Sequence, residues 1–219
     1  MAKNNTLLVF SGLDGAGKST QIDLLRNYLE DNGRKVRYLW TRGGYTSGFN
    51  ALKSFLRKSG GGSVPPPGRT AEREKALGRP VVQKFWLTLA ILDLMRVYGL
   101  QIRLWRMTGK TVICDRYLED TAIDFRLNFP GEPFEKSILW KILTWVTPEP
   151  DHVFVLLISI EESQKRSAQK NEPFPDSRDT LEKRLTNYDK LARENSWDEL
   201  NGEESIETVW RQIQVAVEE

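Results

Sequence analysis

The sequence is poor in the residues that build disulfides and metal clusters. Its 219 residues include one cysteine, Cys114, and one histidine, His152. A single cysteine excludes an intrachain disulfide, and one thiol cannot form a metal cluster. Cys114 lies in the apolar run 111–114, which favours a buried core thiol over a nucleophile. His152 precedes another apolar run, and we expect it to have a structural role.

The chain also lacks a strong charge of either sign and a long apolar run. Its formal net charge is +2, and basic residues are dispersed, so nothing indicates a nucleic acid polymer as partner. No run approaches the roughly 18 apolar residues of a membrane span. The first residues lack the apolar stretch of a signal peptide. We therefore expect a cytoplasmic protein without a membrane partner.

Short apolar runs alternate with helical patterns along the chain. Strands are expected at residues 6–10, 36–40, 111–114, 153–158 and, weakly, 197–200. Helices are expected at residues 18–31, 49–58, 81–107, 117–127, 134–145, 161–168, 178–194 and from about 203 onward. This alternation predicts an α/β fold in which a five-stranded parallel sheet has helices on both faces. We expect one domain over residues 1–219.

Residues 59–79 interrupt this alternation with glycine and proline, which exclude a helix or a central strand. We expect a mobile loop. Its basic side chains, Arg69, Arg73, Lys75 and Arg79, leave open that the loop closes over a phosphate.

Residues 12–19 read Gly-Leu-Asp-Gly-Ala-Gly-Lys-Ser and match the phosphate-loop pattern G-x-x-x-x-G-K-[ST]. The glycines let backbone N–H groups point inward at phosphate oxygens, and the following helix adds the positive end of its dipole. Lys18 is the expected catalytic cation for the β- and γ-phosphates, and the Ser19 hydroxyl is expected to bind Mg²⁺. The motif predicts the three-layer P-loop NTPase fold. The residues expected to bind ATP are Gly12, Asp14, Gly15, Ala16, Gly17, Lys18, Ser19 and Thr20.

Charged residues follow two of the expected strands. Asp115 and Arg116 come after the third strand, and Arg42 comes after the second. Residues just past the carboxyl ends of parallel strands line the ligand crevice. We expect Asp115 to hold Mg²⁺ directly or through water, with Arg116 as a further catalytic residue. Two arginines at one edge suit a phosphorylated acceptor, because a guanidinium binds phosphate oxygens bidentately.

Four further charged residues are candidates for acceptor binding. Asp93 and Arg96 interrupt an apolar stretch at positions i and i+3, where a structural ion pair and an acceptor-reading pair are both open. Asp120 and Asp124 lie one turn apart after Arg116. They are candidates for acceptor hydroxyls or a metal, and otherwise form a solvated helix face.

Several of these segments together resemble the thymidylate kinase family of nucleoside monophosphate kinases. The segments are residues 10–21, Thr41-Arg42, Asp115-Arg116-Tyr117, Pro150-Asp151 and residues 205–209. The resemblance covers nearly the whole chain. It implies ATP with Mg²⁺ as donor and a dTMP-like nucleoside monophosphate as acceptor.

The resemblance also implies roles for individual residues. Arg42 and Arg116 would bind the acceptor phosphate, and Asp14 would lie near the acceptor sugar. A basic lid is implied within residues 165–184. Its candidate residues are Arg166, Lys170 and Arg178.

The sequence departs from the family pattern where the acceptor binds. Gly43 replaces the Glu-Pro that follows Thr-Arg, and Leu92 and Arg96 stand where the family has a base-stacking phenylalanine and a base-reading arginine. The lid lacks the arginine-glycine and Asp-Arg pattern. These departures predict weak activity on dTMP. They leave open a kinase of a nucleoside, sugar or sugar phosphate, or a non-catalytic NTP-binding module. A homodimer is a further expectation.

Overall fold

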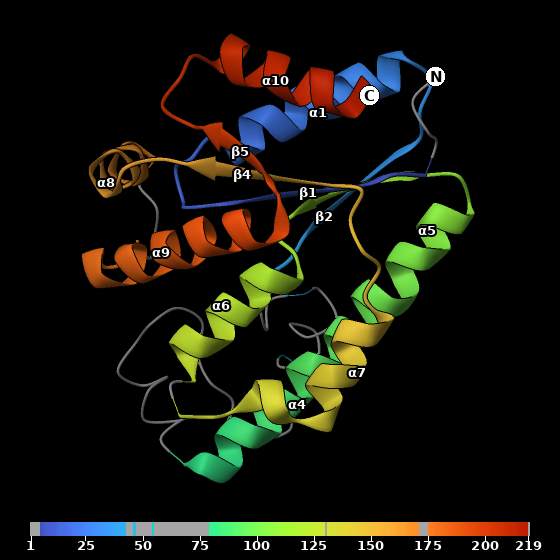
Figure 1. The fold of residues 1–219 in the computed structure, drawn as a ribbon. Helices are drawn as coiled ribbons and strands as arrows, with labels where there is room; N and C mark the ends of the chain where they lie inside the picture. Colours follow the sequence, from blue (N-terminus) through green and yellow to red (C-terminus); the bar gives the residue numbers. More distant parts are fainter. Residues whose placement is uncertain are drawn as a thin grey trace.

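Five parallel strands form one sheet in the order β2-β3-β1-β4-β5 (Figure 1). The computed structural model describes residues 5–42, 46, 54, 79–129, 131–170 and 175–218. The strands are β1 (Leu7–Gly12), β2 (Val36–Trp40), β3 (Thr111–Asp115), β4 (His152–Leu157) and β5 (Asp198–Asn201). The α/β fold class and the five-stranded parallel sheet predicted from the sequence are confirmed.

Helices cover both faces of this sheet (Figure 1). One face carries α1 (Lys18–Asp31) and α10 (Ile206–Glu218), which pack against each other. The other carries a long helix made of α4 (Pro80–Leu94), the π-helical η1 (Met95–Ile102) and α5 (Arg103–Met107), together with α6 (Leu118–Asn128), α7 (Ile138–Val146) and α9 (Arg178–Asn195). Helix α8 (Ile160–Gln169) follows β4.

Most boundaries lie close to the predicted ones, and one predicted helix is divided. The helix expected at 134–145 begins as the short 3₁₀ helix η2 (Phe134–Lys136), and α7 starts only after Ser137. Ser137 caps α7 because its hydroxyl accepts a hydrogen bond from the amide of Trp140. The helix expected at 49–58 and the loop expected at 59–79 lie outside the described residues, except for Ser54 and Arg79.

The order of the strands brings three chain segments to one edge of the sheet. β3 lies between β1 and β2, so Phe10 and Trp40 both lie beside Asp115 in the register of the sheet. The phosphate loop after β1, Asp115-Arg116 at the end of β3 and Thr41-Arg42 after β2 are therefore neighbours. This is the crevice expected at the carboxyl ends of parallel strands.

The long helix is a core element. Residues 80–107 are long and apolar enough to cross a membrane. A buried core helix has the same length and composition, and Ala90, Ile91 and Leu94 pack in one cluster with Val9 and Val112 of the sheet. We therefore interpret this stretch as a core helix.

Cys114 and His152, which the sequence predicts to be structural, both make packing contacts in the fold. Cys114 is fully buried, and burial raises the pKa of its thiol, so it stays protonated. His152 stacks on Phe154, and its Nδ1 lies 3.5 Å from Asp198. Trp140 is buried, whereas Trp145 is exposed on α7. The homodimer stays a prediction.

Candidate functional site

The phosphate loop joins the end of β1 to the start of α1. Gly12 has a φ of 134°, and a Cβ there would overlap the carbonyl oxygen of Leu156 on β4. Gly17, just before the helix, has a φ of 95°. Both positions favour glycine because other residues are strained at positive φ. The buried ammonium of Lys18 donates hydrogen bonds to the carbonyls of Gly12 and Leu13, at 3.1 and 2.7 Å.

Two side chains of helix α8 hold the phosphate loop by hydrogen bonds to its carbonyl groups. The Ser163 hydroxyl donates to the carbonyl of Asp14 at 2.7 Å. The Arg166 guanidinium donates to the carbonyls of Gly15 and Gly202, at 3.2 and 2.9 Å. Arg166, predicted as a lid residue, therefore links the loop to the end of β5.

The other two lid candidates lie in different surroundings. Lys170 lines the same small cavity as the phosphate loop. Arg178 is an exposed residue at the start of α9 that pairs with Glu161 at 2.7 Å and with Glu182 at 3.1 Å. Of the three candidates, Lys170 is thus the one whose side chain borders the phosphate cavity.

A cavity of about 150 Å³ lies over the phosphate loop. It is lined by loop residues that include Lys18 and Ser19, and by Trp40, Asp115, Arg116 and Lys170. Burial lowers the pKa of Lys18 to about 8, and the neighbouring Arg116 acts in the same direction against the opposing effect of Asp115 and Asp14. The cavity therefore carries an ammonium whose charge is sensitive to pH.

Asp115, which lines this cavity, has one carboxylate oxygen without a hydrogen-bond partner among the described residues. Its Oδ2 accepts a hydrogen bond from the Tyr38 hydroxyl at 3.4 Å, whereas its buried Oδ1 has no hydrogen-bond partner in the described chain. Ser19 lines the same cavity. Mg²⁺ prefers oxygen ligands and is commonly held by one or two protein groups together with substrate phosphates. The residues present therefore fit the predicted Mg²⁺, although the described residues contain no group of three or more His, Cys, Asp or Glu able to hold a metal.

Arg116 is a buried hub beside the phosphate loop. It is 3% exposed and has a φ of 73°, an uncommon conformation for a residue other than glycine. Its Nη2 lies 2.5 Å from Asp14 Oδ1, and its Nη1 donates to the Tyr188 hydroxyl at 2.8 Å. Burial by itself would lower the pKa of Arg116, but Tyr188, Asp14 and Asp120 hold it well above its usual value. The guanidinium is therefore permanently charged.

Asp120 holds this arginine in place. Its Oδ1 lies 3.4 Å from Arg116 Nη1 and accepts from the Tyr188 hydroxyl at 2.7 Å. Its Oδ2 accepts from the Ser11 hydroxyl at 2.7 Å and from the amide of Tyr117 at 3.0 Å, which also caps helix α6. Both oxygens are engaged. These contacts favour a positioning role over the predicted contact of Asp120 with an acceptor or a metal.

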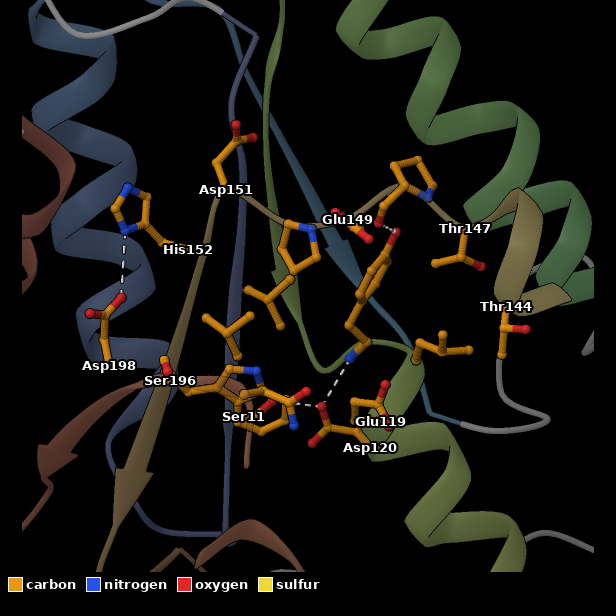
Figure 2. Close-up of a pocket in the computed structure, with 18 residues that line it drawn as sticks. Ser11, Glu119, Asp120, Thr144, Thr147, Glu149, Asp151, His152, Ser196 and Asp198 are labelled. Carbon is orange, nitrogen blue, oxygen red and sulfur yellow. Dashed lines mark hydrogen bonds and ion pairs between the residues drawn. The ribbon is translucent and has the colours of Figure 1, made fainter. Parts of the chain in front are cut away.

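A second, larger cavity of about 560 Å³ has Asp120 among its lining residues (Figure 2). Ser11 and Asp120 line one part of it, and His152 and Asp198 line another. Loop residues 12–19 are not among the described residues that line it. Its size is that of a small-molecule site, but the phosphate-binding chemistry lies in the smaller cavity.

Arg42 and Arg184 form a second cluster, which meets Asp14 at Oδ2, whereas Arg116 meets it at Oδ1. Arg184 Nη2 lies 2.5 Å from Asp124 Oδ1, and Nε lies 2.8 Å from Asp176 Oδ2. Arg42 contacts the same two carboxylates at 3.6 Å each, and its Nη1 lies 3.8 Å from Asp14 Oδ2. Burial by itself would raise the pKa of Asp14, but Arg116, Lys18 and Arg42 hold it well below its usual range. Asp14 is therefore an anion shared by both arginine clusters.

Two hydrogen bonds of Thr41, one from its amide and one from its hydroxyl, fix the position of the segment that carries Arg42. The Thr41 amide donates to the carbonyl of Asp115 at 3.2 Å, and its hydroxyl donates to the carbonyl of Arg116 at 3.1 Å. These bonds tie the segment after β2 to the segment after β3, so Arg42 and Arg116 lie at the same sheet edge.

Asp93 and Arg96 form an ion pair with each other. Arg96 Nη2 lies 2.8 Å from Asp93 Oδ1, and Asp93 also accepts a hydrogen bond from the hydroxyl of Thr46. Arg96 and Leu92 are about half exposed. Of the two interpretations left open by the sequence, the ion pair is present. An acceptor contact by this pair stays a prediction.

The sequence interpretation missed Arg184 and Tyr188 as partners of the site. Both belong to the buried face of α9, with Leu181 and Ala192. Residues 181, 184, 188 and 192 recur at helical spacing, so the available signal was a charged residue on an otherwise apolar stripe. Such a residue needs a partner when it is buried.

Three features together define a P-loop kinase. They are the strand order, the phosphate loop between β1 and α1, and the carboxylate and arginine at the end of β3. The sequence model of the family described as Thymidylate kinase matches residues 89–213. The chain is 28% identical to a thymidylate kinase of Bifidobacterium longum, over 99% of this chain and 98% of that protein. It is 30% identical to one of Prochlorococcus marinus, over 93% and 89%. It is 28% identical to a probable thymidylate kinase of Methanocaldococcus jannaschii, over 96% and 94%. The chain belongs to the thymidylate kinase family and is a nucleoside monophosphate kinase by class.

Proposed function

We propose that this enzyme transfers the γ-phosphoryl group of ATP to a thymine or closely related pyrimidine nucleoside monophosphate. The observation that carries this proposal is that Arg42 and Arg116 both contact Asp14 of the phosphate loop. Two guanidiniums at the strand ends suit an acceptor that already carries a phosphate. The relatives named thymidylate kinase support the choice of base.

The phosphate loop and Lys18 bind the donor in this proposal. The backbone amides of residues 13–18 and the start of α1 bind the β- and γ-phosphates. Lys18 exchanges its two carbonyl contacts for phosphate oxygens and stabilises charge on the transferring group. Mg²⁺, which Ser19 and Asp115 would hold, neutralises charge on the same phosphates when bound. Phosphoryl transfer depends mainly on positioning and charge, so no general base is required.

Arg116 and Arg42 bind the acceptor phosphate. Arg116 is held by Asp120 and Tyr188 before any ligand binds, so little reorganisation is needed. With the described residues Arg42 makes only long ion-pair contacts, and its side chain is 28% exposed, so it can follow the phosphate. Together they would place the acceptor phosphate in line with the γ-phosphate of ATP.

The proposal is tested with a panel of acceptors in the presence of ATP and Mg²⁺, read by ADP release. The panel holds thymine, uracil, cytosine, adenine and guanine nucleoside monophosphates, the parent nucleosides and a set of sugar phosphates. We expect ADP release with a pyrimidine monophosphate and none above background with nucleosides. Release with sugar phosphates alone would replace the proposed acceptor, and ATP binding without ADP release for any acceptor would indicate a non-catalytic NTP-binding module.

The pH dependence of ATP use is expected to report on Lys18. Its pKa in the free enzyme is lowered to about 8, so the ammonium is charged below this pH and loses its charge as the pH rises through it. We therefore expect kcat/KM for ATP to fall above about pH 8, whereas kcat at saturating ATP holds to higher pH because bound phosphates favour the charged form.

Steady-state kinetics across the pH range test this expectation. Lys18→Arg is the matched control, because a guanidinium stays charged over the whole range and the alkaline limb should disappear. A wild-type kcat/KM for ATP that stays level from about pH 7 to about pH 9.5 would contradict the assignment.

A further inference from the structure

The long helix changes its geometry at the turn that carries Tyr98. Residues 95–102 form the π-helical segment η1, a rare geometry that is often found at functional sites. This segment packs beside α7 (Figure 1). A Cβ on Gly99 would come within 2.9 Å of Val146 Cγ2, and Arg103 donates to the carbonyl of Val146 at 3.0 Å. Helix α7 therefore holds η1 in a fixed position.

Tyr98 connects η1 to two other segments of the site. It is fully buried, and its hydroxyl oxygen is 2.8 Å from Thr41 Oγ1 and 3.2 Å from Thr121 Oγ1. Its ring packs on that of Tyr117, with the ring centroids 4.6 Å apart. Burial raises the pKa of the Tyr98 phenol, so the hydroxyl stays protonated and can donate. Tyr98 thus joins η1 to the residue after β2 and to helix α6.

The direction of the hydrogen bond between Tyr98 and Thr41 follows from the available protons. The Thr41 hydroxyl has one proton, which it donates to the carbonyl of Arg116 at 3.1 Å. The Thr41 oxygen must therefore accept the proton of the Tyr98 hydroxyl. A chain of two hydrogen bonds thus runs from the phenol through Thr41 to the backbone of Arg116.

Both arginines proposed for the acceptor phosphate depend on this one threonine. Thr41 directly precedes Arg42 in the chain. The carbonyl of Arg116 accepts from Thr41, and its amide donates to the carbonyl of Phe10 at 2.9 Å. Arg116 has a φ of 73°, a costly conformation that persists where the surrounding structure holds it. Loss of the hydrogen bond from Tyr98 would therefore loosen the backbone at Arg42 and Arg116.

We infer that Tyr98 is a positioning residue for the acceptor phosphate, which acts through Thr41 on the backbone of Arg42 and Arg116. The inference rests on the proposed function, which assigns the acceptor phosphate to these two arginines. Tyr98 is fully buried, so it acts without touching the substrate. Its hydroxyl contacts lie outside the phosphate loop, so binding of the acceptor should depend on it and binding of ATP should not.

Tyr98→Phe tests this inference, because it removes the hydroxyl and keeps the ring against Tyr117. The acceptor is the pyrimidine monophosphate that the wild-type enzyme uses best. We expect its KM and Kd to rise about 10-fold, because both guanidiniums lose their fixed positions, while the KM and Kd of ATP change by less than about 2-fold. Steady-state kinetics give the KM values, and calorimetry with each substrate alone gives the Kd values without turnover.

A double-mutant cycle with Thr41→Val shows whether Tyr98 acts through Thr41. Thr41→Val removes the hydroxyl that links Tyr98 to Arg116, and it should weaken acceptor use to a similar extent. The double variant should lose no more than about 2-fold beyond Thr41→Val, because both changes break the same chain of hydrogen bonds. Losses that multiply would show independent effects and would overturn the inference.

Thr147→Val is the matched control for the loss of a buried hydroxyl. The Thr147 hydroxyl donates to the carbonyl of Leu143 at 2.7 Å, at the end of α7. We expect Tyr98→Phe and Thr147→Val each to lower the thermal unfolding midpoint by about 2–4 °C, since each loses one buried hydrogen bond. Acceptor binding should weaken in Tyr98→Phe and stay normal in Thr147→Val.

The outcomes separate the inference from the function on which it rests. Acceptor KM and Kd within about 2-fold of wild type in Tyr98→Phe would overturn the inference and leave the proposed function standing. Equal weakening of acceptor and ATP, or equal weakening of the acceptor in Thr147→Val, would indicate general loosening and would overturn it as well. A wild-type enzyme that phosphorylates no pyrimidine monophosphate would overturn the proposed function, and the inference with it.

Discussion

Lys18→Ala is expected to lower kcat by a factor of about 10² to 10³ or more while leaving the fold intact. The Lys18 ammonium lies over the phosphate loop and would stabilise charge on the transferring phosphoryl group. Removing one such preorganised donor costs roughly 3 kcal/mol or more in the barrier. The effect on kcat should exceed the effect on the KM for ATP, because the interaction strengthens in the transition state.

The fold should tolerate this change because the buried ammonium is not favourable for stability. Burial lowers the pKa of this ammonium from 10.5 in the unfolded chain to about 8 in the folded protein. Below pH 8 the ammonium is charged in both states, and keeping the buried charge costs the folded state stability. Thermal unfolding at neutral pH should therefore show no loss of stability in Lys18→Ala. Lys190→Ala, which removes an exposed lysine paired with Glu194, is the control. Full activity in a folded Lys18→Ala protein would contradict the proposed role of the phosphate loop in phosphoryl transfer.

Arg116→Ala is expected to impair both acceptor use and stability. The guanidinium is buried, and its loss leaves Asp14, Asp120 and Tyr188 without their shared partner. Breaking a buried ion pair on one side costs about 3–5 kcal/mol. The acceptor KM should rise or kcat should fall, with little change in ATP affinity. Steady-state kinetics for each substrate, together with urea unfolding, measure the two effects.

Arg42→Ala is the matched comparison because it should affect the acceptor alone. Arg42 is 28% exposed, and its contacts within the described part of the chain are ion pairs of 3.6–3.8 Å, so its removal should change stability by less than about 1 kcal/mol. Tyr188→Phe retains Arg116 and removes one of its hydrogen bonds. It should give an intermediate loss of acceptor use. If either arginine variant lost ATP binding and kept normal acceptor kinetics, that arginine would bind the donor and not the acceptor.

The sequence was sufficient for the parts of the fold that depend on local patterns. Apolar runs such as residues 6–10 and 111–114 predicted strands because their residues suit a sheet covered on both faces. The glycines and Lys18 of residues 12–19 predicted the phosphate loop because its geometry is set within a few residues. The break at Ser137 was missed, since the apolar pattern of residues 134–145 continues through a residue that acts as a helix cap.

The partners of the charged residues did not follow from the sequence. Asp120 and Asp124 have the same side chain, share one helix and lie one turn apart, so no pattern distinguishes them. Their roles differ because α9 packs against α6 and delivers Tyr188 to one and Arg184 to the other. These contacts join residues 68 and 60 positions apart in the chain.

The sequence by itself determined the class of protein and predicted the sheet edge at which we propose that donor and acceptor bind. These properties depend on backbone geometry and on the order of strands, both of which local composition constrains strongly. The tertiary structure decided which carboxylates have both oxygens engaged, as Asp120 has, and which keep one oxygen without a hydrogen bond from the described residues, as Asp115 and Asp124 do. Only packing decides this, because the pairing of a buried charge depends on which side chains from distant segments reach it, and a single ångström separates a hydrogen bond from an unpaired atom.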